Sequence, residues 1–203
     1  MIFLADGVRL YHVRHGQTDW NAEGRLQGQS DIPLNDKGRA QAERNGRALK
    51  THFDEAGIPP DGLRHVASPL GRAQETMRIV RGGLGLPPTV FETEPAVIEI
   101  AFGEWAGFTT PELKASGQAG LVRARRADKW GFTPPGGESY RDLSARVAGW
   151  LATVEEDTLL VAHGGVFRVL MGLICGVPEQ ELPTIDATQD HAALFQGGTM
   201  RYI

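Results

Sequence analysis

The chain has 203 residues, a formal net charge of −4 and a hydrophobic fraction of 41%. This length suits one domain with a sizeable core, and we expect a single domain over residues 1–203. The negative net charge argues against bulk attraction to nucleic acid or to an anionic membrane. No stretch approaches the roughly 18 apolar residues that a membrane helix needs. We therefore expect neither nucleic acid nor a membrane as a partner.

The cysteine content and the first residues bear on the cellular compartment. The single cysteine, Cys175, excludes an internal disulfide and a CxxC metal or redox pair. Because Cys175 lies in the apolar run 166–175, we expect a buried thiol. Residues 1–4 lack a basic start and are followed at once by Asp6, so we expect no secretory signal. These features together favour a cytoplasmic protein.

The first third of the chain predicts a strand followed by a helix. Residues 8–13 form a short apolar run that predicts a strand. Asn35 can cap a helix over about 36–53. The small residues Ala42 and Gly46 fall on its apolar stripe, so this helix should pack closely on a sheet.

The next segment repeats the pattern. Residues 63–67 predict a strand, and Ser68 predicts a helix N-cap with Pro69 at the first helical position. Residues 89–92 predict a short strand after that helix.

The last third predicts a helix, a strand, a second helix and a hairpin. Ser139 can cap a helix over about 139–156, and residues 158–162 predict a strand. The run 166–175 is apolar nearly all round, as expected of a helix packed on both sides. The tail has a hairpin signature, with 191–196 and 199–203 flanking two glycines. Strands that alternate with helices predict the α/β class.

A loop-rich segment over about 106–137 interrupts this alternation. It is rich in glycine and proline, and we expect a lid-like insertion over the strand ends with one or two short helices. It also holds the densest basic cluster of the chain: Arg123, Arg125, Arg126 and Lys129. Two interpretations stay open, a solvated helix face and a lid that recognises the non-phosphate part of an anionic substrate.

Two His-Gly pairs, each directly after a predicted strand, are the strongest functional signal. They are His15-Gly16, preceded by Arg14, and His163-Gly164. The carboxyl ends of parallel strands meet at the ligand crevice of an open α/β sheet. A neighbouring guanidinium lowers an imidazole pKa, which favours the neutral ring that a nucleophile needs. Arg72, in the first turn after Ser68, is a second cation that can face this crevice. The pattern predicts chemistry on a phosphoryl group, whereas His12, His52 and His65 are expected to be structural.

Six sequence blocks in order support a more specific interpretation. They are LYHVRHGQTDWN at 10–21, GRLQGQSDIPL at 24–34, SPLGRAQET at 68–76, EIAFGEWAG at 99–107, GGES at 136–139 and VAHGG at 161–165. Together they resemble the signature of the histidine phosphatase superfamily, the phosphoglycerate-mutase-like proteins, and specifically its phosphatase-type branch. The resemblance implies a three-layer α/β/α sandwich with a central, mostly parallel sheet and a small lid.

The resemblance also implies roles for individual residues. His15 would be the nucleophile that becomes phosphorylated, and Glu99 would protonate the leaving oxygen and then activate water. The remaining implied contacts to the phosphate or substrate are Arg14, Arg72, His163, Asn21, Gln27, Gly28 and Gly164. The resemblance implies no cofactor and no metal. One departure is visible: Ala106 stands where the family usually has a second glutamate after Trp105.

Three functions follow as alternatives. The first is a metal-independent phosphomonoesterase that acts on a small phosphorylated metabolite. The second is a cofactor-dependent phosphoglycerate mutase, although such mutases typically carry Thr-Gly-Trp where this chain has Gln27-Gly28-Gln29. The third is a phosphate-binding module without catalysis. The substrate cannot be named from the sequence, and an edge formed by the closing strand leaves a homodimer open.

Overall fold

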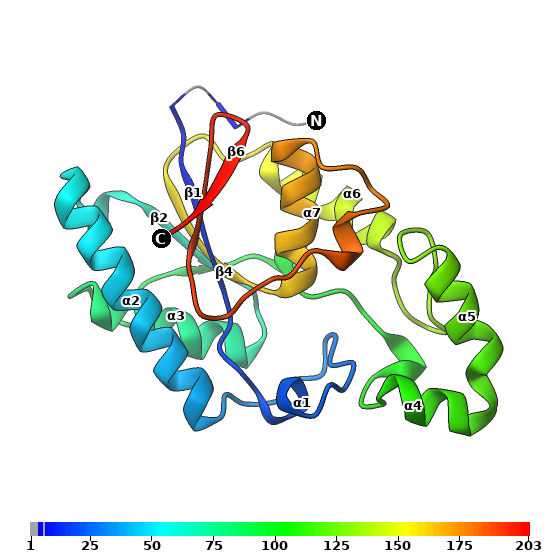
Figure 1. Ribbon diagram of the computed structural model, residues 1–203. Coiled ribbons are helices and arrows are strands. Elements are labelled where there is room, and N and C mark those ends of the chain that lie inside the picture. The colour runs from blue at the N-terminus through cyan, green and yellow to red at the C-terminus, as the bar shows by residue number, and fades with distance from the viewer. Residues whose placement is uncertain (1–3, 6) are drawn as a thin grey trace.

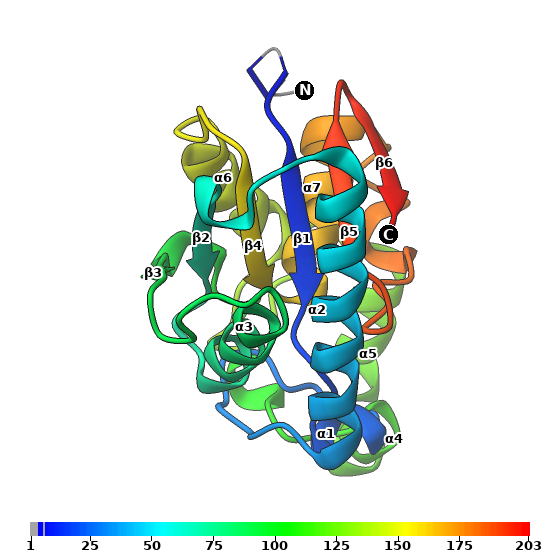
Figure 2. The same cartoon turned by 90° about the vertical axis from the view of Figure 1, so that its left-hand side faces the viewer.

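The computed structural model describes residues 4, 5 and 7–203. The expectation about a secretory signal concerns residues that lie mostly outside this range. Within it, six strands form one sheet in the order β3-β2-β4-β1-β5-β6, with helices on both faces (Figures 1 and 2). The strands are β1 (Leu10–Arg14), β2 (Arg64–Ala67), β3 (Glu92–Thr93), β4 (Thr158–Ala162), β5 (Ala193–Gln196) and β6 (Thr199–Tyr202).

The sheet is mostly parallel, as predicted. Strand β4 pairs in parallel with both β1 and β2, and β3 pairs in parallel with β2. Only β5 and β6 run antiparallel. They form the predicted hairpin around Gly197 and Gly198, whose φ values of 56° and 76° suit a turn that only glycine adopts without cost. The parallel strands bring the ends of β1, β2 and β4 to one edge.

Helices cover the sheet on both sides, which confirms the α/β sandwich. Figure 1 shows α2 and α3 on one side of the sheet and α6 and α7 on the other. Each pair closes its own apolar core against the sheet. The helices are α1 (Asp19–Ala22), α2 (Asp36–Ala56), α3 (Gly71–Gly83), α4 (Thr110–Leu113), α5 (Ala119–Ala127), α6 (Tyr140–Leu151) and α7 (Gly164–Cys175). None of the helices that the structure describes has the length and apolar character to cross a bilayer.

Two of the three predicted helix caps are confirmed. The Asn35 side chain accepts the Gly38 N–H at 2.9 Å at the start of α2. Ser139 forms a capping box with Asp142 at the start of α6. Helix α6 ends at Leu151 rather than near residue 156, because the chain turns there to enter β4.

The third cap prediction is wrong. Helix α3 begins at Gly71, and neither Ser68 nor Pro69 belongs to it. Its first N–H groups are instead accepted by the Asp31 carboxylate, at 2.9 Å from Gly71 N and 3.4 Å from Arg72 N. A carboxylate at a helix N-terminus is favoured by the helix dipole. An acceptor from a distant loop therefore replaces the local one.

Three smaller expectations also need correction. The short strand after α3 is β3, at Glu92–Thr93, and not 89–92. Gly46 packs against Val80 and Gly83 of α3, not against the sheet. Cys175 is half-buried, because α7 leaves part of its last turn uncovered.

The segment over 106–137 contains the short helices expected of it. Helix α4 and helix α5 are joined by a π-type turn, Lys114–Gln118, that breaks at Gly117 with a φ of 88°. Figure 1 shows both helices at one side of the molecule, away from α2 and α3. Two tryptophans, Trp105 just before this segment and Trp130 within it, are buried. The Trp130 ring stacks on the Tyr140 ring, with 6.2 Å between the ring centres.

Candidate active site

His15 lies directly after β1 and is 2% exposed. Its backbone N–H continues the sheet by donating to Ala162 O at 2.9 Å. The ring Nδ1–H donates to Gly16 O at 2.8 Å. Because a carbonyl oxygen can only accept, the proton is on Nδ1, and the lone pair is on Nε2. Burial, Arg72 and Arg14 together hold the pKa of His15 well below its ordinary value. His15 is thus a neutral imidazole whose Nε2 carries no proton, the form that a nucleophilic histidine needs.

Arg72 holds this nitrogen in place. Its Nε lies 3.3 Å from His15 Nε2, and its side chain is almost completely buried. Its Nη1 donates to Ser30 O and its Nη2 donates to Gly28 O, each at 2.6 Å. Gly28 has a φ of 54°, a conformation that favours glycine, and this turns its carbonyl toward Arg72. The guanidinium is therefore fixed beside the His15 ring.

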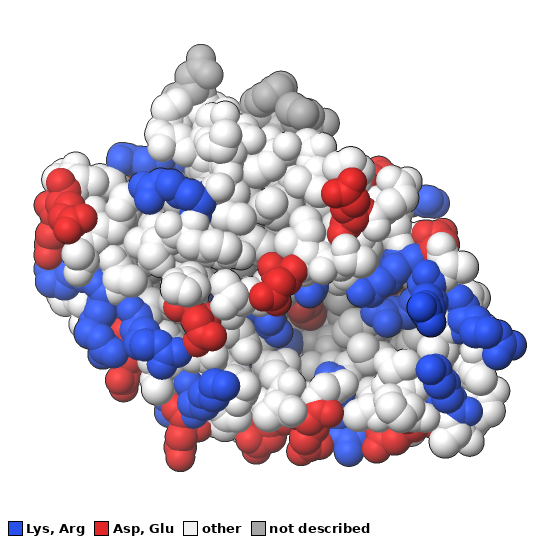
Figure 3. Space-filling view, viewed as in Figure 1, with Lys and Arg blue, Asp and Glu red and all other residues white. Residues whose placement is uncertain are grey.

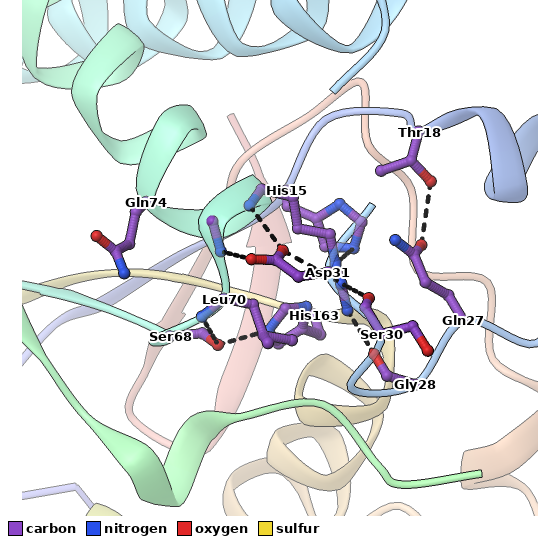
Figure 4. Close-up of polar contacts among 12 residues, drawn as sticks. His15, Thr18, Gln27, Gly28, Ser30, Asp31, Ser68, Leu70, Gln74 and His163 are labelled. Carbon is purple, nitrogen blue, oxygen red and sulfur yellow. Dashed lines mark hydrogen bonds and ion pairs between the residues drawn. The ribbon is translucent and has the colours of Figure 1, made fainter. Parts of the chain in front are cut away.

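The second His-Gly pair meets the first. The rings of His15 and His163 are 5.1 Å apart, with their planes at 61°. His163 is fully buried, and its Nε2 lies 2.6 Å from Ser68 Oγ (Figure 4). Burial is the main cause that holds the pKa of His163 well below its ordinary value. Both imidazoles are neutral in the folded protein.

Glu99 approaches the site from the opposite side of the sheet edge. Its carboxylate accepts the Ile100 N–H at 2.9 Å and the Gly165 N–H at 3.1 and 3.2 Å. A Cβ on Gly165 would overlap Glu99 Oε1. Gly165 is therefore the residue that admits the carboxylate to the N-terminus of α7.

These residues surround a cavity of about 150 Å³. It contains all the predicted site residues except His163, whose ring lies 5.1 Å from that of His15. Its lining is Arg14, His15, Asn21, Arg25, Leu26, Gln27, Gly28, Arg72, Glu99, Ile100, Phe102, Tyr140, Gly164, Gly165 and Arg168.

Several buried nitrogens around this cavity have no hydrogen-bond partner among the residues that the structure describes. They are Arg14 Nε, Gln27 Nε2 and His163 Nδ1. Unpaired buried donors are costly, so a cluster of them around one hollow indicates a ligand rich in acceptors. Arg14 adds a buried positive charge, whose pKa is lowered mainly by burial. The donors and the positive charge of the cavity indicate that it binds an anion.

Asn21 and Gln27 form a connected polar wall. The Asn21 amide donates to Gln27 Oε1 at 3.1 Å, and the Thr18 hydroxyl donates to the same oxygen at 3.0 Å. Gln189, which the sequence did not single out, donates to His15 O at 2.9 Å and to Asn21 Oδ1 at 3.2 Å. This leaves Gln27 Nε2 free for a ligand.

Sequence reasoning assigned no role to seven further residues of the cavity: Arg25, Leu26, Ile100, Phe102, Tyr140, Gly165 and Arg168. A signal for Arg168 was present, because it lies four residues after Gly164 and so on the same face of α7. Arg168 Nη1 and Arg14 Nε both lie close to Gly164, at 3.2 and 3.4 Å from the position of a Cβ there. Two cations thus flank one glycine.

The predicted basic cluster is divided by the fold. Arg123 and Arg126 are exposed, whereas Arg125 and Lys129 are half-buried. The Arg125 guanidinium lies over the Phe102 ring, 5.6 Å from its centre. Burial, with Arg125 and Arg168 nearby, lowers the pKa of Lys129 to about 8. Figure 3 shows basic side chains gathered beside a hollow on the α5 side of the molecule.

Arg168, Arg125 and Lys129 form what we call the cationic track. Among the described residues, no carboxylate forms an ion pair with any of the three. Arg25, by contrast, is paired with Glu23 at 2.5 Å and with Glu112 at 2.8 Å. The cationic track therefore carries positive charge without carboxylate partners from the cavity to the segment over 106–137.

The largest hollow lies elsewhere. It measures about 560 Å³ and is lined by the far end of α3 and by the β2–β3 edge. His65 lines it and donates from Nε2 to Pro60 O at 2.8 Å. Its one buried nitrogen without a partner is His65 Nδ1, whereas the smaller cavity has Arg14 Nε and Gln27 Nε2 in its lining, so the smaller cavity is the better candidate for an anion site. Among the described residues no group of three His, Cys, Asp or Glu side chains could hold a metal ion.

Comparison with known proteins agrees with this geometry. The family model of the histidine phosphatase superfamily (branch 1) matches residues 10–196. A 2,3-bisphosphoglycerate-dependent phosphoglycerate mutase from Beijerinckia indica is 31% identical over 184 residues, covering 86% of this chain and 84% of that protein.

Two solved structures are also similar. A mycobacterial glucosyl-3-phosphoglycerate phosphatase in complex with VO3 has a TM-score of 0.78 and 29% identity, covering 97% of this chain and 96% of that one. The α-ribazole phosphatase from Shigella flexneri has a TM-score of 0.79 and 26% identity, covering 97% and 95%. The chain belongs to the histidine phosphatase superfamily (branch 1).

Proposed function

We propose that this protein is a phosphomonoesterase that works through a phosphohistidine at His15 and needs no metal. The observation that carries the proposal is the neutral His15 ring, whose unprotonated Nε2 accepts the Arg72 Nε–H at 3.3 Å. Two buried guanidiniums and the unpaired nitrogens of the cavity supply the charge and the donors that a phosphoryl group requires. Relatives with phosphatase activity support this choice.

The reaction follows in two steps. His15 Nε2 attacks phosphorus, and the bond from phosphorus to the ester oxygen breaks. Glu99 donates a proton to the leaving oxygen, while Gly16 O stabilises the positive charge that develops on the ring through its Nδ1–H. Water then attacks phosphorus, Glu99 takes its proton, and the bond from phosphorus to nitrogen breaks. Inorganic phosphate leaves and His15 returns to its neutral form.

The test is to trap the intermediate. Alkaline denaturation during turnover of p-nitrophenyl phosphate in EDTA should leave phosphorus on His15, detected by peptide mass spectrometry. His15→Ala should lose the label and reduce kcat/KM by at least about 10³-fold. His52→Gln, a half-buried histidine outside the cavity, should keep both. Full activity of His15→Ala would exclude the proposed nucleophile.

A mutase is the second candidate, because mutase relatives match at 31% identity over most of the chain. A mutase would pass the phosphoryl group from His15 to a second substrate and so must exclude water from the cavity. Incubation of the protein with 3-phosphoglycerate and 2,3-bisphosphoglycerate distinguishes the two. Release of inorganic phosphate supports hydrolysis, and formation of 2-phosphoglycerate without it supports transfer.

The cationic track suggests which phosphomonoesters are preferred. Of the three cations without carboxylate partners, Arg168 lines the cavity, Arg125 lies over the cavity residue Phe102, and Lys129 lines a neighbouring hollow together with Arg125. Arginine binds carboxylates and phosphates through paired hydrogen bonds, each worth about 1.5–3 kcal/mol when charged. We expect substrates that carry a second anionic group to be favoured over neutral analogues.

A matched pair of substrates tests this preference. The ratio of kcat/KM for 3-phosphoglycerate to that for glycerol 3-phosphate isolates the carboxylate, and it should be about tenfold or more. Arg125→Met should lower this ratio about fivefold or more. Arg123→Met, an exposed arginine on the same helix, should leave the ratio unchanged. If the two kcat/KM values are equal in the wild type, the preference for a second anionic group is refuted, while the phosphohistidine mechanism is unaffected.

A further inference from the structure

Ser68 makes an unexpected contact. The sequence assigns its hydroxyl to a helix cap, but α3 begins later and takes its cap from Asp31. The Ser68 side chain is completely buried and turns toward His163, with 2.6 Å between Oγ and Nε2 (Figure 4). Because this buried hydroxyl does not cap α3, its role lies in its contact with His163.

The direction of this hydrogen bond follows from the proton count. The Ser68 oxygen accepts the Leu70 N–H at 3.4 Å. Among the described residues, His163 Nε2 is the one group placed to accept the single Ser68 hydroxyl proton. If His163 donated instead, that proton would be left buried without an acceptor, which costs about 1–3 kcal/mol. Ser68 therefore donates, and His163 Nε2 accepts.

The consequence appears on the other ring nitrogen. In a neutral imidazole only one nitrogen carries a proton, so an accepting Nε2 places it on Nδ1. His163 Nδ1 is buried and has no partner among the described residues. It belongs to the ring next to His15, and His15 lines the cavity together with Arg14 and Gln27, whose Nε and Nε2 are unpaired donors as well. A buried N–H in this position requires an acceptor that the protein does not provide.

We propose that Ser68 is a positioning residue that fixes His163 in its Nδ1–H tautomer, so that His163 donates a hydrogen bond to the phosphoryl group on its way to and from His15. The donor is a neutral ring and adds no third cation to the pocket. His15 has the same tautomer for the opposite reason, because its Nδ1–H donates to a carbonyl. The contact to the phosphoryl group rests on the proposed function, whereas the tautomer does not.

The tautomer is tested in the resting protein by nitrogen NMR of ¹⁵N-histidine. Nδ1 of His163 should give the signal of a protonated nitrogen and Nε2 that of an unprotonated one. Added orthovanadate or inorganic phosphate should shift Nδ1. A protonated Nε2 in the wild type overturns the proposal before any variant is made. A correct tautomer without a response to either anion would instead count against the phosphate pocket, and so against the proposed function.

Variants separate positioning from packing. Ser68→Ala should mix the two tautomers, weaken vanadate inhibition about tenfold and lower kcat/KM by a similar factor. Ser68→Thr keeps the hydroxyl and should restore the wild-type tautomer. Thr158→Val removes another fully buried hydroxyl, at the start of the strand that leads to His163, and should change neither readout. An unchanged His163 spectrum in Ser68→Ala would also overturn the proposal.

Discussion

At the scale of single residues, the site depends on glycines, which leave room for its other groups because they have no side chain. Gly16 packs so tightly against Gly38 that a Cβ on either would overlap the other segment's backbone. Gly165 leaves the space that the Glu99 carboxylate occupies. These glycines allow His15 and Glu99 to approach the same small cavity, with backbone N–H groups holding the carboxylate.

Gly165→Ala should therefore impair catalysis rather than folding. The added methyl group would expel the Glu99 carboxylate from its position, and kcat should fall about 10²-fold through loss of the proton donor. Substrates with a good leaving group, such as p-nitrophenyl phosphate, should suffer less than alkyl phosphates because they need less protonation. Gly149→Ala, whose Cβ would meet nothing, is the matched control. Equal losses on both substrate types would argue against Glu99 as the acid.

At the scale of elements, the fold delivers each functional residue from the end of a strand or the start of a helix. His15 follows β1, Ser68 follows β2 and His163 follows β4. These strands are parallel neighbours, so their ends meet at one edge. Arg72 lies in α3, so the position of α3 relative to the sheet also matters. Helix α2 fixes this position through the close contact of Gly46 with Val80 of α3.

Gly46→Leu should lower the free energy of unfolding by about 1–3 kcal/mol, because the side chain would force α2 away from α3. The shift would also move Arg72 relative to His15 and so reduce kcat/KM. Gly82→Leu, on α3 where a Cβ meets nothing within 4 Å, should cost much less. Urea unfolding of the two variants measures the difference, and equal midpoints would disprove the tight α2–α3 contact.

At the scale of the whole molecule, four buried histidines have a lowered pKa, and the three with the larger shifts, His12, His15 and His163, couple the site to stability. The pKa of His12 is lowered to about 3, chiefly by burial, and the pKa values of His15 and His163 are also well below normal. In the unfolded chain these groups titrate near 6.5. Below that pH the unfolded chain binds more protons than the folded one. The stability from these neutral histidines is complete above about pH 6.5 and is lost as the pH falls toward the folded values.

Acid should therefore destabilise the protein measurably before its carboxylates titrate. Each of the three histidines should contribute up to about 1.4 kcal/mol per pH unit below pH 6. Urea unfolding at pH 7, 6 and 5 and constant ionic strength measures the slope. His12→Gln should reduce it by the share of one histidine, whereas His191→Gln, an exposed position, should not. A slope that His12→Gln leaves intact would contradict the burial of a neutral ring.

The sequence by itself determined the order of strands and helices, the insertion over 106–137, and the positions of His15, Arg72, Glu99 and His163 in one site. The order of elements follows from signals within a few residues, the apolar period and caps such as Asn35 and Ser139. The two His-Gly pairs follow from motifs at strand ends, and the role of Glu99 from the resemblance of the sequence blocks to the histidine phosphatase superfamily. Only the tertiary structure decided that Asp31 caps α3, that Ser68 turns to His163, and that Arg125 lies over Phe102. The physical reason is that these partners are far apart in the chain, so packing of the whole sheet and its helices sets their distances, which no local pattern encodes.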